Sequence, residues 1–193
     1  MSERLALISG FGPFESFGRN PSGEVARALA RSPPPGLQVV SGEIPVSFAR
    51  APAAWDELLE GLDGARPILF LGLGVQRRAG FRLERRARPR LKLVPRVDVD
   101  GRLPREFSRA GPTLATEFAL EPLLARLEAR GVADAWISES AGGYVCEWIY
   151  HHILTRGRER GTAAFFVHVP PERFAPLERQ IEVVRWILEA LTS

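Results

Sequence analysis

The chain of 193 residues is poor in the residue types that mark several classes of protein. Its only cysteine, Cys146, cannot form a disulfide within the chain, which excludes a disulfide-stabilised extracellular fold. The three histidines and the cysteine do not form a clustered set of metal ligands, so we expect neither a metal nor another cofactor. No stretch approaches the roughly 18 continuous apolar residues of a membrane span, so we expect no membrane association.

Lysine is almost absent, because Lys92 is the only one among 26 basic residues. The arginines are spread along the chain with one cluster between Arg77 and Arg96, and no basic platform interleaved with aromatic residues accompanies them. We therefore expect no nucleic-acid binding. The sequence also shows no positively charged leader followed by an apolar segment, which together with the single thiol predicts a cytoplasmic location.

Apolar runs alternate with helical patterns along the whole chain. With 45% hydrophobic residues the chain is long enough for one sizeable core. Strands are predicted at 5–9, 39–46, 68–73, 133–138 and 164–169, and helices at 21–32, 47–62, 113–130, from 143 onward, and at 177–191. This order predicts one α/β domain over residues 1–193, a three-layer α/β/α sandwich around a mostly parallel twisted sheet. In such a sheet, ligands gather at the carboxyl ends of the strands.

The alternation breaks between Gln76 and Arg109. This arginine-rich segment contains a possible edge strand at Phe81–Arg85 and a hairpin-like stretch at Val97–Gly101, but no strong helical periodicity. Segments of this length inside a domain are usually functional or pack on a partner. We expect one of these roles here.

The stretch Ser138–Tyr150, SESAGGYVCEWIY, is the first candidate for chemistry. It predicts a glycine turn between a strand and a helix, with Cys146 in the first helical turn. Unpaired N–H groups and the helix dipole stabilise an anion there, so the thiol ionises more easily. An inert buried thiol is the alternative, because Cys146, Ile149, Tyr150 and Ile153 also form one apolar helix face.

A second candidate is His168, which lies in the apolar strand AFFVHV. A buried imidazole costs free energy unless a partner satisfies it, and that partner could be the backbone alone. A Cys–His pair, however, supplies both a nucleophile and a general acid–base, and it works best with a third group that orients the imidazole. His151 and His152 are interpreted as structural residues on a helix.

Four separated motifs resemble those of the pyrrolidone-carboxylate peptidases, the pyroglutamyl peptidase I or C15 family of cysteine peptidases. They are GFGPFESFGRNPS, FRLERRA, ESAGGYVCEWIYHH and AFFVHVPP, and they occur in order between Leu5 and Pro171. The resemblance implies Cys146 as nucleophile, His168 as base and then acid, and Glu84 as the residue that orients His168. Without it, Glu84 would be interpreted as a surface carboxylate.

The resemblance also implies the partners and the binding residues. Phe14 and Tyr144 match aromatic positions that enclose a lactam ring, with Phe11 nearby, and Arg96 matches an arginine near the site. Core packing is the alternative role for the aromatic residues. The implied substrate is a peptide with an N-terminal pyroglutamate, and the implied assembly is a homodimer or homotetramer.

The sequence departs from the family pattern at three places. Leu73 replaces an amide side chain of the substrate pocket, Glu147 replaces an asparagine after the cysteine, and Ala87–Pro89 replaces another short segment. We therefore expect weak or redirected activity, since Leu73 offers no hydrogen bond to the lactam and a carboxylate beside Cys146 disfavours the thiolate. A divergent amidase and a non-catalytic binding protein with the same fold remain the alternatives.

Overall fold

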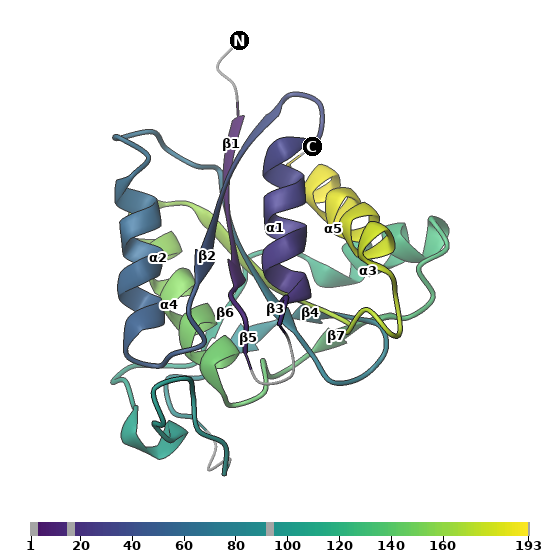
Figure 1. Cartoon of the computed structure of the whole chain (residues 1–193). Coiled ribbons are helices and arrows are strands. Elements are labelled where there is room, and N and C mark those ends of the chain that lie inside the picture. The colour runs from purple at the N-terminus through teal and green to yellow at the C-terminus, as the bar shows by residue number, and fades with distance from the viewer. Residues whose placement is uncertain (1–3, 15–17, 92–94, 193) are drawn as a thin grey trace.

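A computed structural model describes residues 4–14, 18–91 and 95–192. Its centre is a six-stranded sheet with the order β2-β1-β3-β8-β4-β7 (Figure 1). Apart from the antiparallel pair of β4 and β8, all strand pairs in this sheet are parallel. The strands span Arg4–Phe11 (β1), Leu37–Ile44 (β2), Leu69–Val75 (β3), Phe81–Glu84 (β4), Ala135–Ser138 (β7) and Ala163–Val169 (β8).

Five α-helices cover the two faces of the sheet in the described part of the chain. One face carries α2 (Arg50–Glu60) and α4 (Val145–Arg160), and the other carries α1 (Pro21–Arg31), α3 (Leu120–Ala129) and α5 (Leu177–Thr192) (Figure 1). Each face has its own core. Trp55, Phe70 and Phe166 pack in the core under α2 and α4, whereas Leu71 and Phe165 pack in the core on the opposite face. The predicted three-layer α/β sandwich is confirmed.

The helix α1 begins at Pro21, as predicted, because neighbouring residues stabilise its start. The Asn20 side chain accepts a hydrogen bond from the Ser22 N–H at 3.2 Å, and Pro21 occupies the first helical position, where its missing N–H costs nothing. The second helix begins at Arg50, three residues later than predicted. Ser47 still stabilises its start, because its hydroxyl oxygen accepts the Arg50 N–H at 3.0 Å.

Two predictions about the middle of the chain are wrong. The segment Phe81–Glu84 is not an edge strand, because β4 lies between β8 and β7, and β7 is the edge. The helix predicted from residue 113 begins only at Leu120. Before it, β6 (Leu114–Ala115) pairs antiparallel with β5 (Arg86–Ala87) in a separate two-stranded sheet. Both errors arise because a local sequence pattern does not indicate how a strand pairs with distant segments of the chain.

The segment after β5 folds as a series of turns and one short 3-10 helix, η1 (Pro104–Glu106). The predicted hairpin at 97–101 is a turn organised by the buried Asp98, whose carboxylate accepts the N–H groups of Phe48, Asp100 and Arg102 at 2.8–2.9 Å. Residues 92–94 of this segment lie outside the described residues. Among the described helices, none is both long enough and apolar enough to cross a membrane.

Candidate active site

Cys146 lies in the first turn of α4, directly after the glycine turn that ends the segment following β7. Gly142 and Gly143 have φ values of 101° and 73°, a backbone conformation that favours glycine and allows the tight turn into the helix. Tyr144 is the N-cap residue and Cys146 follows two positions later, as predicted. The thiol is partly exposed and lines a pocket of about 280 Å³ at the carboxyl ends of β1, β3 and β8. It is therefore close to the positive end of the helix and accessible to a ligand.

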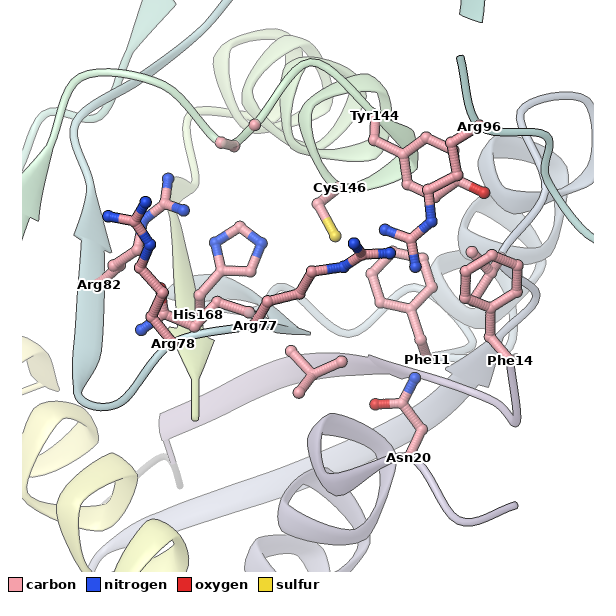
Figure 2. A pocket seen from close by; sticks show the side chains of 15 residues that line it. Phe11, Phe14, Asn20, Arg77, Arg78, Arg82, Arg96, Tyr144, Cys146 and His168 are labelled. Atoms are coloured by element: carbon pink, nitrogen blue, oxygen red, sulfur yellow. The ribbon is translucent and has the colours of Figure 1, made fainter. Parts of the chain in front are cut away.

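His168 and Cys146 both line this pocket (Figure 2), and the buried Glu84 contacts the His168 ring. The imidazole Nδ1 lies 2.7 Å from Glu84 Oε1, and the Cys146 side chain lies next to the ring in the pocket. A Cβ atom placed on Gly74 would lie 3.1 Å from both Cys146 Sγ and His168 Nε2, so glycine on β3 leaves room for the two groups to meet. The structure thus brings together the three side chains that the resemblance implies as catalytic.

The surroundings of His168 favour its charged form. Complete burial lowers the pKa of the imidazole, but the interactions with the Cys146 thiolate and with Glu84 outweigh burial and raise the pKa to about 9. A protonated imidazole next to a thiolate is the reactive form of a Cys–His pair. Glu84 is fully buried, which makes the sequence alternative of a surface carboxylate wrong.

Arg82 supports this arrangement from the same strand. Its guanidinium ion-pairs with Glu84 at 2.9 Å and donates to Ser138 Oγ at 2.9 Å and to the carbonyl oxygen of Ser140. Arg82 and Glu84 are two residues apart on β4, so both side chains point to the same face of the sheet. The arginine therefore compensates the buried carboxylate and ties it to the turn that precedes Cys146.

The predicted aromatic residues form the other end of the pocket. The rings of Phe14 and Tyr144 are 6.0 Å apart, and Phe11 is a further, almost fully buried lining residue. The Arg96 guanidinium lies 4.9 Å from the Phe14 ring centre and 4.8 Å from that of Tyr144. The Tyr144 hydroxyl donates to the Val97 carbonyl oxygen at 2.6 Å and so fixes the ring. These four residues lie together as expected.

Leu73 does not belong to this pocket, and its prediction as a binding residue is wrong. Its side chain is fully buried in the core on the face of the sheet opposite α4. Successive residues of a strand face opposite sides, so Gly72 and Gly74 face the α4 side of the sheet, where Gly74 lies next to Cys146 and His168, and Leu73 faces the other side. A strand buried on both faces gives no sequence signal for which residue points to which side.

Glu147 also lies outside the residues that line the pocket. It is buried, and its carboxylate accepts the Gly143 N–H at 2.6 Å, the Ser140 hydroxyl at 3.1 Å and the Arg88 N–H at 3.1 Å. These donors offset its negative charge and hold the turn before α4. The argument that Glu147 disfavours the thiolate therefore loses its basis.

Four further polar side chains line the pocket without having been predicted as site residues: Asn20, Gln76, Arg77 and Arg78. Asn20 is also the N-cap residue of α1. The other three follow β3 directly, at the edge of the sheet where ligands gather, and the two arginines begin the only arginine cluster. The position of these arginines directly after a predicted strand is the sequence feature from which they could have been predicted as site residues.

A thiol, an imidazole and a carboxylate at the carboxyl edge of an α/β sheet place the protein among the cysteine-type hydrolases. Comparison with known proteins gives the particular family. The sequence profile described as pyroglutamyl peptidase matches residues 4–177, and the chain belongs to this family. The resemblance found from the four motifs is confirmed.

Individual relatives agree over most of the chain. A pyrrolidone-carboxylate peptidase of Chromobacterium violaceum is 34% identical over 86% of this chain and 78% of its own length, and one of Deinococcus radiodurans is 31% identical over 97% and 94%. The solved pyrrolidone carboxyl peptidase of Fervidobacterium islandicum superimposes with a TM-score of 0.85 at 29% identity, covering 98% of both chains. The enzyme of Pyrococcus furiosus, at 23% identity and a TM-score of 0.86, has the same fold.

Proposed function

We propose that the protein removes an N-terminal pyroglutamyl residue from peptides, with Cys146 as nucleophile, His168 as general acid and base, and Glu84 as the group that orients His168. The observation that carries the proposal is the meeting of Cys146, in the first turn of α4, with His168 in one pocket, where the His168 ring contacts the buried Glu84 carboxylate at 2.7 Å. Family membership supports the same reaction.

The reaction follows from these groups. The Cys146 thiolate attacks the carbonyl carbon that joins pyroglutamate to the next residue. The tetrahedral intermediate expels the amine, which takes a proton from the His168 imidazolium, and leaves a thioester on Cys146. Neutral His168 then takes a proton from water, whose oxygen attacks the thioester, and the product leaves as free pyroglutamate. Cys146 leaves the product as a thiolate and His168 keeps the proton taken from water, so both residues are again in the state in which the reaction began.

The first turn of α4 supplies stabilisation for the negative oxygen of the intermediate. The first backbone N–H groups of a helix have no partner within it, and the Cys146 N–H is among them. Donors of this kind that point at a developing oxyanion are worth about 10²–10³ in rate. At the aromatic end, Phe11, Phe14 and Tyr144 offer apolar contact for the lactam ring, and Arg96 offers N–H donors for its carbonyl oxygen.

The basis for expecting weak or redirected activity does not hold, because neither Leu73 nor Glu147 lines the pocket.

The proposal is tested by hydrolysis of a chromogenic pyroglutamyl amide. We expect turnover by the wild type, a loss of at least about 10³-fold in Cys146→Ser, and no requirement for a divalent metal. Full activity of Cys146→Ser would contradict the mechanism. A thiol that alkylates only after unfolding would instead favour the non-catalytic binding protein.

We also propose a homodimer or homotetramer in the cytoplasm. A nucleophilic thiol must stay reduced, which a reducing compartment ensures. Val97 and Val99, 47% and 44% exposed, lie together on the long segment that was predicted to pack on a partner.

A further inference from the structure

The pocket has two chemically different ends on either side of the Cys146–His168 pair. Figure 2 shows Phe11, Phe14 and Tyr144 on one side of Cys146, and Arg78 and Arg82 beyond His168 on the other. The aromatic end suits an uncharged lactam ring. That ring carries no charge that would require the arginines, so the arginine end is available for another part of the substrate.

The chemistry fixes which part of the substrate reaches that end. His168 must protonate the leaving nitrogen, so this nitrogen lies beside the imidazole and the peptide that follows it leaves the pocket past His168. Arg82 is already paired with Glu84. Arg78 is exposed and has no ion-pair or hydrogen-bond partner for its side chain among residues 4–14, 18–91 and 95–192. Its charge therefore faces the first residue after the scissile bond.

The loop that carries Arg78 is fixed. The Gln76 N–H donates to the Val169 carbonyl oxygen at 3.0 Å, and the Gln76 amide donates to the carbonyl oxygens of Ala79 and Gly80. Gly80 has a φ of 83°, and a Cβ there would lie 2.1 Å from the Asp134 carbonyl oxygen, so the loop packs closely against the chain before β7. The backbone that presents Arg78 is thus ordered before a ligand binds, which lowers the entropy cost of recognition.

Apart from the Cys146–His168 pair, the charged side chains that line the pocket are all basic. Its described lining contains four arginines, Arg77, Arg78, Arg82 and Arg96, and neither aspartate nor glutamate. We propose, on the basis of the function proposed above, that the site prefers peptides with a carboxylate on the first residue after pyroglutamate. This carboxylate is the side chain of an acidic residue or the free terminus of a dipeptide. Arg78 is the residue that recognises it, by a charge-assisted hydrogen bond.

Two matched pairs of substrates test the preference and separate its sources. Pyroglutamyl-glutamic acid α-amide is compared with pyroglutamyl-glutamine amide, which differs only in the side-chain charge. The free dipeptide pyroglutamyl-alanine is compared with its amide, which differs only at the terminus. We expect kcat/KM to be about three- to tenfold higher for the anionic member of at least one pair at low salt, and the ratio to fall in about 0.5 M NaCl.

Arg78→Gln is expected to lower that ratio about three- to fivefold, because the exposed ion pair between Arg78 and the substrate carboxylate is lost. The matched control is Arg66→Gln, which removes the same charge from an exposed position before β3, at the opposite end of that strand. It should leave the ratio unchanged.

The outcomes are distinguishable. A higher rate on the glutamic acid substrate assigns the preference to the side chain, and a higher rate on the free dipeptide assigns it to the terminus; either supports the inference. Equal rates within both pairs, or a ratio that survives Arg78→Gln, overturn it while cleavage of the neutral amides upholds the proposed function. Failure to cleave any of the four substrates overturns the proposed function itself.

Discussion

Glu84, after Cys146, is a residue whose charge acts on His168, the proposed general acid and base. Its carboxylate contributes to raising the pKa of His168 to about 9, so His168 keeps its proton below that pH and loses it above. Activity of the wild type should therefore fall as the pH rises through about 9, because a neutral imidazole cannot protonate the leaving amine.

Glu84→Gln keeps a hydrogen-bond acceptor and removes the charge. We expect kcat to fall about 10²–10⁴-fold and the alkaline limb of the pH–rate profile to move to lower pH. Glu139→Gln is the control, since Glu139 is half-exposed and pairs with Arg85 and Arg86 outside the pocket. An unchanged alkaline limb in Glu84→Gln would show that the carboxylate does not set the pKa of His168.

Gly74 is the residue that leaves space for the nucleophile and the imidazole. Gly74→Ala would add a Cβ 3.0–3.1 Å from His168 Cδ2, His168 Nε2 and Cys146 Sγ, so both groups must move by tenths of an ångström. We expect kcat to fall about 10- to 100-fold, because small displacements of reacting groups are costly, with little change in stability.

Gly72→Ala on the same strand gives the contrast for Gly74→Ala. Its Cβ would lie 2.3 Å from the Phe166 ring in the core, so we expect a loss of about 1–3 kcal/mol in the free energy of unfolding. Urea denaturation and single-turnover kinetics measure the two effects. Equal stability losses in both variants would refute the assignment of Gly74 to the reacting pair.

At the scale of the elements, α2 and α4 are joined by ionic contacts as well as by apolar packing. Asp56 on α2 accepts hydrogen bonds from Arg156 at 2.8–2.9 Å and contacts His152 at 2.9 Å, both on α4. Partial burial raises the pKa of Asp56, but these partners outweigh it and leave the pKa below its ordinary value. The carboxylate therefore stabilises the fold above the pKa of the unfolded chain, near 3.8, and this contribution is lost as the pH falls.

Asp56→Asn should lower the free energy of unfolding by about 1 kcal/mol at pH 7, a value kept small because Asp56 is partly exposed. The difference from the wild type should shrink below about pH 4, where the wild-type carboxyl group also becomes neutral. Urea denaturation at pH 7 and pH 3 measures both values. A difference that is the same at the two pH values would mean that packing, not charge, joins the helices here.

The elements also show which structural signals a sequence contains. Asn20 and Pro21 define the start of α1 because a helix cap depends on neighbouring residues. The β5–β6 pairing joins Ala87 to Leu114, but the local sequence around each residue does not indicate its distant partner. The predicted helix therefore extended over β6. At the site, the three residues proposed as a triad could be identified from motifs. The side of the sheet to which Leu73 points and the pairing of Arg82 with Glu84 depend instead on strand register and burial.

At the scale of the whole molecule, the proposed assembly connects to the site through one loop. The Tyr144 hydroxyl donates to the carbonyl oxygen of Val97, whose side chain is exposed, so burial of Val97 and Val99 in an interface would also hold the aromatic end of the pocket. We expect light scattering at micromolar concentration to give two or four times the 21.4 kDa of one chain. Val97→Ser with Val99→Ser should shift the mass toward a single chain. A wild-type mass of 21.4 kDa would contradict the assembly.

The position of β8 has a consequence for how the protein is made. This strand is the last to leave the ribosome, yet it lies between β3 and β4 in the sheet. Until it emerges, β3 and β4 each keep an open edge where β8 later pairs, so the sheet cannot join its two parts, β2-β1-β3 and β4-β7. His168 lies on β8, so the site that contains Cys146 and His168 cannot assemble on a nascent chain before β8 has been made.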